Sequence, residues 1–411
     1  MHSTIRRRFM ALPILAASLL WAAAPARAEG YRNPPMGPAL GRSGNATVWG
    51  DDASSLYFNP ALLADLQNDD VLLSLSIART RIDWSGPGGM AASSRDPWQI
   101  LPNLFASRDL SDSPWTLGVG LTTPYGQSVE WPLDTPLRYS IPYFAEIGMM
   151  NATPVAARRF SPTLAAGFGL DLYYSTIEFK QRMPLDVALG IPGLPEGEMR
   201  AEGDGTAVGG RLGVTWNPLD GHQFAVSYRS RFRMDYDGDF SVRGIPPPLD
   251  PGPSDFSTRL KYPDIFTAGY GILLSDTWRA EMQVEWLGWS VNRDQPLRVE
   301  APYDALVGGA PIQNRWKDTW TFGVGTDWTF SPGWTLRAGY TYMESPIPDE
   351  TLSPLLPDAD RQVFAIGLGH TFGSHSLDLA YTYNRLEKRT TPIGRFEYQA
   401  DLIGVSYAFR F

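Results

Sequence analysis

The last ten residues of the chain, 402–411, read LIGVSYAFRF, and their character alternates from one residue to the next. One parity is apolar and aromatic: Ile403, Val405, Tyr407, Phe409 and Phe411. The intervening positions hold Leu, Gly, Ser, Ala and Arg, which are mostly small or polar. Successive side chains of a β-strand point to opposite faces. This stretch therefore predicts a strand with one apolar face and one small or polar face.

The same period of two runs backward from this stretch to about residue 70. In 375–386, 333–344 and 315–330 the large aromatic residues again share one parity and gather toward the segment ends. Alternation over about ten residues with aromatic ends is typical of strands that cross a membrane. A soluble sandwich or barrel also has alternating strands and is the competing interpretation. Its strands are usually shorter, and they seldom place so many large aromatics on one parity.

The connections between the segments also alternate, between tight turns and long Gly/Pro-rich stretches such as 184–197 and 241–255. Outer-membrane barrels have this asymmetry together with an even strand number. We therefore predict an all-β protein in which residues 71–411 form one fourteen-stranded antiparallel transmembrane β-barrel. The predicted strands lie near 70–84, 98–107, 113–126, 137–157, 163–182, 198–217, 222–240, 256–274, 277–292, 315–330, 333–344, 360–372, 375–386 and 395–411.

The composition excludes several classes of function. The 411 residues include no cysteine, so a disulfide scaffold and a thiolate metal site are impossible. The net charge of -9 argues against a nucleic-acid binder that relies on a basic face. Only four histidines are present, and His222 and His375 fall at short turns, so no acid–base constellation is indicated. We expect no enzyme, no metal and no cofactor.

The first 28 residues have the pattern of a secretory signal peptide. Arginines at 6–8 precede an apolar run over 9–23, and Ala26-Arg27-Ala28 matches a cleavage site. We expect the mature chain to begin at Glu29. An anchor helix is the alternative, but the apolar run is shorter than the ~20 residues that a spanning helix needs.

Residues 29–70 show no strand period and are rich in Gly, Ala, Ser and Asn. Asn59 can cap a short helix that begins at Pro60, where the missing N–H of proline costs nothing. Small residues and short helices suit a plug, or hatch, inside a narrow lumen. An exposed tail is the alternative, although the apolar Leu56, Tyr57 and Phe58 make full exposure costly.

The stretch 41–66, GRSGNATVWGDDASSLYFNPALLADL, resembles the N-terminal hatch of the FadL-type outer-membrane transporters of long-chain fatty acids and other hydrophobic compounds. Asn59, Pro60 and Ala61 match the NPA motif of that family. Further similar stretches are LTTPYGQSVEWPLDTPLRY (121–139), WTLRAGYTYMESPIP (334–348), PDADR (357–361) and the terminal strand that ends in Phe411.

The resemblance implies a fourteen-stranded barrel with an N-terminal hatch in the outer membrane of a Gram-negative bacterium. Hydrophobic substrate would bind in an outer groove, pass to an interior pocket and leave sideways at a kinked third strand, without an energy source. The expected partners are that substrate, outer-membrane lipid and lipopolysaccharide, and the barrel assembly machinery, for which Phe411 looks like the assembly signal. We expect a monomer and no nucleic-acid partner.

Several residues become candidates for these steps. Pro124, Tyr125 and Gly126 are candidates for the lateral gate, because proline removes a ladder donor from the third strand. An ordinary strand end leading into an outer loop is the alternative there. The outer-groove candidates are Leu185, Val187, Leu189, Ile191, Leu194, Ile245 and Leu249, since exposed apolar residues on a loop favour ligand contact. Packing of loop on loop is the alternative for these residues.

The identity of the substrate stays open at this stage. Burying a sixteen-carbon acyl chain at ~0.8 kcal/mol per methylene gives about 11 kcal/mol, and its carboxylate would favour a cation. The candidates are Lys180, Arg182, Arg279, Arg315, Lys317 and Arg337. Each could instead pair with acidic residues such as Glu281, Glu285 and Asp327. A neutral substrate, such as an aromatic hydrocarbon, an alkane or a sterol, is also compatible. A general diffusion porin is less so, because a hatch would fill its lumen.

Overall fold

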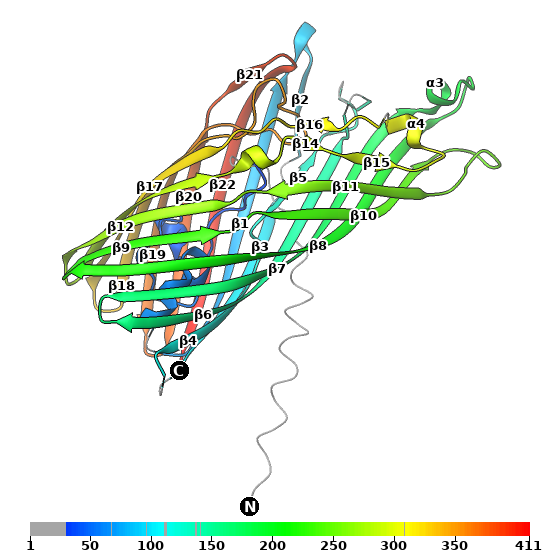
Figure 1. Cartoon of the computed structure of the whole chain (residues 1–411). Helices are drawn as coiled ribbons and strands as arrows, with labels where there is room; N and C mark the ends of the chain where they lie inside the picture. The colour runs from blue at the N-terminus through cyan, green and yellow to red at the C-terminus, as the bar shows by residue number, and fades with distance from the viewer. Residues whose placement is uncertain are drawn as a thin grey trace, which may run out of the picture.

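A computed structural model describes residues 30–66, 68–95, 97–110, 113–135, 138–139, 141–307 and 309–411. The predicted signal peptide, 1–28, lies outside the described residues. Most of the described chain forms one large antiparallel sheet that curves round and closes on itself (Figure 1). None of the described helices is long and apolar enough to cross a bilayer.

The sheet contains fourteen barrel strands, and four of them are interrupted and carry two labels each. In chain order they are β1 (Asp70–Ser85), β3 (Gln99–Asp109), β4 with β5 (Trp115–Thr122, Gly126–Glu130), β6 (Phe144–Ser161), β7 (Leu164–Pro184), β8 (Glu196–Leu219), β9 with β10 (His222–Arg229, Phe232–Arg243), β11 with β12 (Ser254–Tyr262, Ile265–Ser275), β13 with β15 (Trp278–Leu287, Leu297–Val299), β17 (Thr319–Ser331), β18 (Trp334–Met343), β19 (Arg361–Phe372), β20 (His375–Leu386) and β22 (Gly394–Arg410).

The barrel is closed by the first and last strands. β1 pairs with β22 in an unbroken antiparallel register that runs from Asp70 opposite Arg410 to Ser85 opposite Arg395. Each strand also pairs with its sequence neighbours, so the closed sheet has no free edge along this seam. The prediction of a fourteen-stranded antiparallel barrel is confirmed.

The predicted alternation separates the two faces of the barrel wall. On β20, Leu379 is 56% exposed and Tyr381 is also exposed, whereas Ala380 and Thr382 point inward and are buried. Every barrel strand has large apolar side chains on its outer face, and together they form a wide apolar belt. A monomer in water rarely exposes apolar patches beyond a few hundred Å². The belt therefore requires an apolar solvent such as the lipid of a membrane.

Three predicted strand segments differ clearly from the structure. The predicted segment 277–292 stops at Leu287, before a 3-10 turn at Trp289–Val291, and the other two lie near the third strand. The predicted segment 113–126 breaks after Thr122 and resumes as β5, and the predicted segment 137–157 begins only at Phe144. Pro124 sits in the break, and Pro142 lies just before β6. Proline has no N–H to donate to a ladder, which explains why regular pairing stops at both positions.

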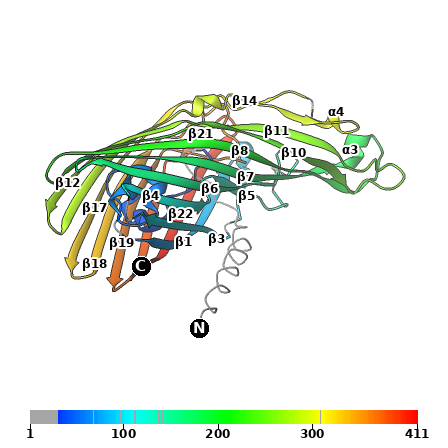
Figure 2. The same cartoon turned by 60° about the horizontal axis from the view of Figure 1, so that its bottom comes forward.

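The long connections gather at one end of the barrel and the tight turns at the other (Figures 1 and 2). The long connections contain short elements that the sequence did not predict. They are β2 (Ala91–Ser93), β14 (Asp294–Gln295), β16 (Ile312–Gln313), β21 (Arg389–Thr391), η3 (Pro87–Gly89), α3 (Leu185–Leu189), η4 (Trp289–Val291) and α4 (Asp304–Val307).

Residues 30–66 lie inside the barrel, toward the end with the tight turns (Figures 1 and 2). They form η1 (Gly37–Arg42), α2 (Ser55–Phe58) and η2 (Pro60–Asp65), and we call them the hatch. The predicted short helix at Pro60 is present as the 3-10 helix η2. Leu40, Leu56 and Leu63 of the hatch are completely buried, so the apolar side chains of this segment pack against the barrel wall.

Candidate functional site

The hatch is held in the lumen by a buried network of ion pairs. Arg42 Nη1 donates to Glu281 Oε1 and to Asp327 Oδ2, each at 3.1 Å, and both acceptors belong to the barrel wall. Arg279, also on the wall, bridges Asp327 and the hatch residue Asp51. Buried charges are stable only when paired and hydrogen-bonded. This network therefore fixes the position of η1.

Glycines on the inner face of the wall let the hatch backbone approach closely. A Cβ on Gly339 would lie 2.2 Å from the carbonyl carbon of Arg42, and one on Gly323 would lie 1.8 Å from Asn45 Oδ1. Both distances are far below van der Waals contact. The small residues on the inner face of the strands therefore leave the space that the hatch backbone occupies.

The NPA motif lies at the start of η2, against the same glycine-lined inner face of the wall. Asn59 Oδ1 accepts a hydrogen bond from Ala61 N at 3.1 Å, which is the predicted cap, and Asn59 Nδ2 donates to Thr47 O at 3.0 Å. Pro60 lies over Gly167 of β7, where a Cβ would come within 2.5 Å of the Pro60 carbonyl carbon. The motif thus joins two parts of the hatch and seats them on the wall.

Above the hatch the lumen is filled by a cluster of aromatic side chains. Tyr31, from the start of the hatch, packs against Tyr262 and Trp316 with ring centroids 6.0 and 5.3 Å apart. Phe232 stacks on Tyr262 at 4.5 Å, and Tyr125 lies 4.8 Å from the Tyr262 ring. We call these residues the aromatic cluster. It offers an apolar ligand many ring faces.

The third strand is broken at Thr123–Tyr125, and the hatch fills the break. Asn33 N donates to Pro124 O at 2.9 Å, and Gly126 N donates to Tyr31 O at 2.8 Å. Arg32 and Tyr125 form an isolated antiparallel bridge between these bonds. The gate candidates Pro124, Tyr125 and Gly126 therefore pair with the hatch just beyond the last β3–β4 pair, Leu104 opposite Leu121. β5 pairs with β6.

The first described residue of the hatch contacts a buried carboxyl group in the loop before β19. Gly30 N donates to Asp358 Oδ2 at 3.2 Å, and Ser345 Oγ donates to the same oxygen at 3.0 Å. Burial raises the pKa of Asp358 to about 7, despite these hydrogen bonds. The contact between hatch and loop therefore involves a group that titrates near neutral pH.

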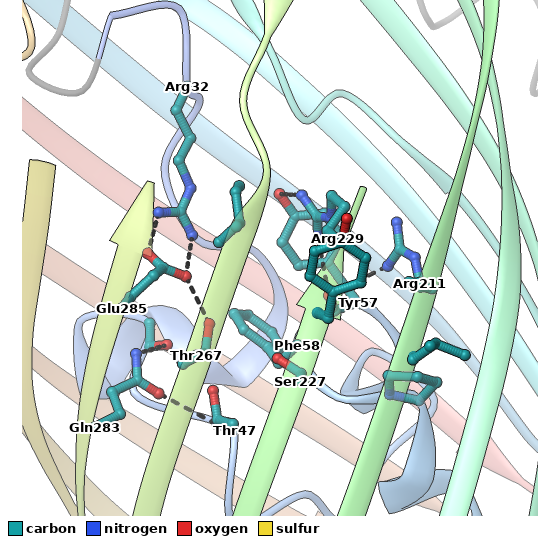
Figure 3. A pocket seen from close by; sticks show the side chains of 15 residues that line it. Arg32, Thr47, Tyr57, Phe58, Arg211, Ser227, Arg229, Thr267, Gln283 and Glu285 are labelled. Carbon is teal, nitrogen blue, oxygen red and sulfur yellow. Dashed lines mark hydrogen bonds and ion pairs between the residues drawn. The ribbon is translucent and has the colours of Figure 1, made fainter. Parts of the chain in front are cut away.

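Three arginines surround a cavity of about 40 Å³ between the hatch and the wall (Figure 3). Arg32 pairs with Glu285, and Arg211 pairs with Asp171. Arg229 contacts Tyr57: its Nη2 donates to Tyr57 O at 3.0 Å, and its guanidinium lies 4.4 Å from the centre of the ring.

The outer-groove candidates divide into two groups. Val187 is 76% exposed, and Leu189, Ile191 and Leu249 are also exposed at the tips of the long connections. Leu185 and Ile245 are instead buried, and Leu194 packs against the same apolar core. The alternative of packing within the loops thus describes this second group.

The carboxylate-binding candidates are brought to different places. Arg279 and Arg337 face the lumen as expected, but both are occupied: Arg279 by Asp51 and Asp327, Arg337 by Asp378. Lys180 and Arg182 pair with glutamates on the outer half of the barrel. Arg315 and Lys317 are exposed. The structure does not gather these six residues at one site.

The assembly-signal candidate, Phe411, is exposed beyond the end of β22. Its ring lies 5.6 Å from that of Phe409, and its N–H donates to Asp69 O at 3.1 Å. The C-terminal residue is thus tied to the residue that precedes β1, at the seam that closes the barrel.

Sequence reasoning missed Arg229, Tyr173 and Tyr31 as lumen residues. The parity of β9 places Arg229 inward beside Ser227, and that signal was available. No sequence signal places Tyr31 beside the lumen aromatics. The hatch has no repeating pattern from which its position against the barrel wall could be predicted.

A closed barrel with an apolar outer belt, a plug fixed in its lumen and an aromatic cluster above the plug defines an outer-membrane transport channel. The family model described as outer membrane protein transport protein (OMPP1/FadL/TodX) matches residues 15–410, and the chain belongs to this family. It is an outer-membrane channel of the FadL/TodX type for hydrophobic compounds, and the family consists of transport channels rather than enzymes.

Relatives and solved structures agree with this assignment. The chain is 24% identical to the long-chain fatty acid transport protein of Escherichia coli K12, over 90% of each chain. It is 22% identical to the putative outer membrane protein NMB0088 of Neisseria meningitidis, over 97% of this chain and 98% of that protein. A FadL homologue from Pseudomonas aeruginosa has the same fold, with a TM-score of 0.80, 21% identity and coverage of 93% and 100%. The toluene transporter TodX of P. putida also has this fold, with a TM-score of 0.73 and 19% identity. The match covers 93% of this chain and 99% of that chain.

Proposed function

We propose that this protein is a passive uptake channel for long-chain fatty acids, with aromatic hydrocarbons or alkanes as the alternative substrates. Substrate binds first in an apolar groove of the outer loops. It enters the aromatic cluster when the start of the hatch rearranges, and it leaves sideways through the break in the third strand. Relatives named for fatty acid transport and for toluene transport support the two substrate classes equally.

One observation carries the proposed path. Residues 31–33 of the hatch occupy the lumen and the wall at once, because Tyr31 fills the aromatic cluster while Asn33 pairs with the broken third strand. A movement of this segment would vacate a binding site in the lumen and an opening in the wall together. Coupling of the two steps then needs no energy source.

The hatch movement is tested with a reversible lock. Arg32 and Tyr125 form a non-hydrogen-bonded antiparallel pair, the geometry in which Cα atoms lie about 4.5 Å apart and a disulfide fits. The chain contains no cysteine, so Arg32→Cys with Tyr125→Cys introduces one defined crosslink. Oxidised protein should take up radiolabelled oleate more slowly than the same protein after reduction. Equal uptake in the two states would refute a moving hatch.

The lateral gate is tested at the break itself. Pro124→Val with Gly126→Val supplies an N–H and two β-branched side chains, which should favour continuous pairing. Uptake should slow while the barrel stays folded, as judged by heat-modifiable migration on gels. Uptake at the rate of the parent protein, in a folded variant, excludes release at this position.

Growth distinguishes the substrate classes. A deletion strain is supplied with oleate, toluene or an alkane as its sole carbon source and then complemented. We expect restored growth on oleate; restoration on toluene or alkanes alone would assign the alternative. A liposome swelling assay with small sugars should show no swelling, since a general porin is the remaining rival.

A further inference from the structure

Two arginines stand on the lipid-facing side of the barrel at the end with the tight turns. Arg108 lies near the end of β3 and Arg158 near the end of β6, both on the parity that faces outward. Among the described residues at this end, no other arginine or lysine has outward parity. The tight turns of outer-membrane barrels are periplasmic. A charge that faces lipid is tolerated near the bilayer surface and not at its centre, so both arginines lie at the level of the periplasmic headgroups.

Two aromatic rings hold the guanidinium of Arg158 in place. Its Cζ lies 5.5 Å from the centre of the Trp115 ring and 5.1 Å from the centre of the Phe160 ring. Both distances are within the range of a cation–π contact. Trp115 is directly opposite Arg158 in the β4–β6 ladder, and Phe168 packs edge-on against Trp115 with ring centroids 6.4 Å apart. The charged group is therefore positioned on the outer surface rather than free to swing.

Arg158 nevertheless has no partner of opposite charge. Its Nε is buried without a hydrogen bond, and its guanidinium forms no ion pair within the described part of the chain. A guanidinium that lies against rings still has five N–H donors in its plane. The adjacent Arg159 has the opposite parity and is satisfied in the hatch, by the carboxylate of Asp65 and the carbonyl oxygen of Ala64. The unmet capacity therefore belongs to the lipid-facing arginine.

Arg108 adds a second positive charge on the same outer face. It is opposite Leu117 in the β3–β4 ladder, and Leu117 shares its parity with Trp115. Since β4 lies between β3 and β6, Arg108 and Arg158 stand on either side of Trp115. The side chain of Arg108 is 75% exposed, and its ion pair with Asp69 is 3.7 Å long. A long, exposed pair of this kind is weak, which leaves Arg108 able to face a second anion.

We propose that Arg158, Trp115 and Phe160 bind the phosphate of a glycerophospholipid in the periplasmic leaflet of the outer membrane, with Arg108 beside it. The phosphate oxygens would accept charge-assisted hydrogen bonds from the in-plane N–H groups of Arg158. This inference is independent of the proposed uptake function, because the ligand is a lipid of the surrounding membrane and the site is on the outer surface, not in the lumen.

The surroundings favour a lipid over a soluble anion. Phe168 and Leu117, both beside Trp115, are 53% and 45% exposed on the apolar belt. Acyl chains can cover these side chains while the phosphate meets the arginines, whereas a free phosphate would leave them bare. A charged head next to an apolar surface therefore matches a ligand that has both parts.

A lipid bound here would contact the foot of the third strand. β4 begins at Trp115, and its ladder with β3 extends only from Thr116 opposite Asp109 to Leu121 opposite Leu104. Contacts to β3, β4 and β6 at once would hold this short strand between its neighbours. A ligand that binds the folded protein and not the unfolded chain stabilises the fold, so the lipid should raise the thermal midpoint.

The experiment measures binding to the purified full-length protein in a nonionic detergent, by native mass spectrometry and by thermal midpoint. Dioleoyl phosphatidylglycerol carries a phosphate and two acyl chains, dioleoylglycerol carries the chains alone, and glycerol phosphate carries the phosphate alone. Arg158→Gln removes the charge, and Arg158→Lys retains it as a point charge. Arg159→Gln is the matched control, because it makes the same change at the adjacent residue, which faces the hatch. Heat-modifiable migration on gels checks that each variant is folded.

Phosphatidylglycerol should bind the parent protein and raise its thermal midpoint, and neither dioleoylglycerol nor glycerol phosphate should do so at the same concentration. Arg158→Gln should weaken the binding of phosphatidylglycerol about tenfold or more. Arg158→Lys should be intermediate, because an ammonium group cannot make a bidentate contact with phosphate. Trp115→Leu should also weaken binding, since it removes one of the rings that position the guanidinium. Arg159→Gln should bind phosphatidylglycerol as the parent protein does.

Equal affinity for phosphatidylglycerol in folded Arg158→Gln and Arg159→Gln proteins would overturn the proposed site. Dioleoylglycerol that binds as tightly as phosphatidylglycerol would overturn the role of the phosphate and leave an unspecific apolar surface. Displacement of phosphatidylglycerol by an equal concentration of glycerol phosphate would identify a soluble anion as the ligand and overturn the assignment to a lipid. None of these measurements depends on uptake, so the proposed function stands or falls separately.

Discussion

Gly339→Ala should release the hatch without unfolding the barrel. The new Cβ would lie 2.2 Å from the carbonyl carbon and oxygen of Arg42. Ordinary contact begins near 3.4 Å, so the Arg42 backbone has to move by about 1.2 Å. Both obstructing atoms belong to the backbone and cannot rotate away as a side chain could.

A displacement of that size would break the ion pairs of Arg42. Its contacts to Glu281 and Asp327 are 3.1 Å long, and an added 1 Å carries them beyond hydrogen-bond distance. Breaking a buried pair costs about 3–5 kcal/mol, which would raise the fraction of molecules with a displaced hatch by about two to four orders of magnitude.

Ion conductance across planar bilayers and tryptic cleavage within the hatch measure this displacement. Both should increase in Gly339→Ala, while heat-modifiable migration should still report a folded barrel. Gly210→Ala is the control: it makes the same change on the same sheet, and its nearest neighbour, Gly169 O, is 3.6 Å away. If the Gly339→Ala protein conducts as few ions and resists trypsin as well as the Gly210→Ala control, the docking of the hatch on this glycine is refuted.

Three further predictions concern stability and assembly. The pKa of Asp358 in the folded protein, about 7, lies above its ordinary value of 3.8, so the free energy of unfolding should fall by about 3 kcal/mol between pH 4 and pH 7. Asp358→Asn should remove this decline in urea titrations, and an unchanged slope would contradict the assignment. Asp171→Asn leaves the buried Arg211 unpaired and should cost about 3–5 kcal/mol, seen as a lower urea midpoint; an unchanged midpoint would show that this pair is dispensable. Deletion of Phe411 should lower the folded, heat-modifiable fraction in the outer membrane, whereas full assembly would count against its role as a signal.

The sequence predicted the barrel well because membrane strands obey one strong constraint. Lipid on one side and a packed lumen on the other impose a period of two, and Leu379 and Thr382 lie on the faces that their parity predicts. Boundaries were missed where proline and the hatch replace ladder pairing, as at Pro124. Nothing local to Pro124 and Gly126 indicates that their backbone hydrogen bonds go to Asn33 and Tyr31 of the hatch.

The candidate site was harder to predict for a related reason. Parity places Arg211, Arg229, Arg279 and Arg337 alike in the lumen. Which of them lacks a carboxylate depends on cross-strand register and on the path of the hatch, and neither can be read from one strand at a time. The sequence therefore favoured Arg279 and Arg337, which hold carboxylates, and passed over Arg229, which contacts Tyr57 and has no carboxylate partner among the described residues.

The two ends of the hatch differ in whether a hydrophobic substrate can replace their contacts. Tyr31 is held mainly by aromatic rings, and an apolar ligand that takes its place restores the buried area that its departure exposes. Arg42 is held by Glu281 and Asp327, and no apolar ligand compensates for breaking those pairs. A ligand shifts a conformational equilibrium only by its difference in affinity for the two states. We therefore expect substrate to move the segment at Tyr31 and to leave η1 in place, so that the plug persists while the path to the wall opens.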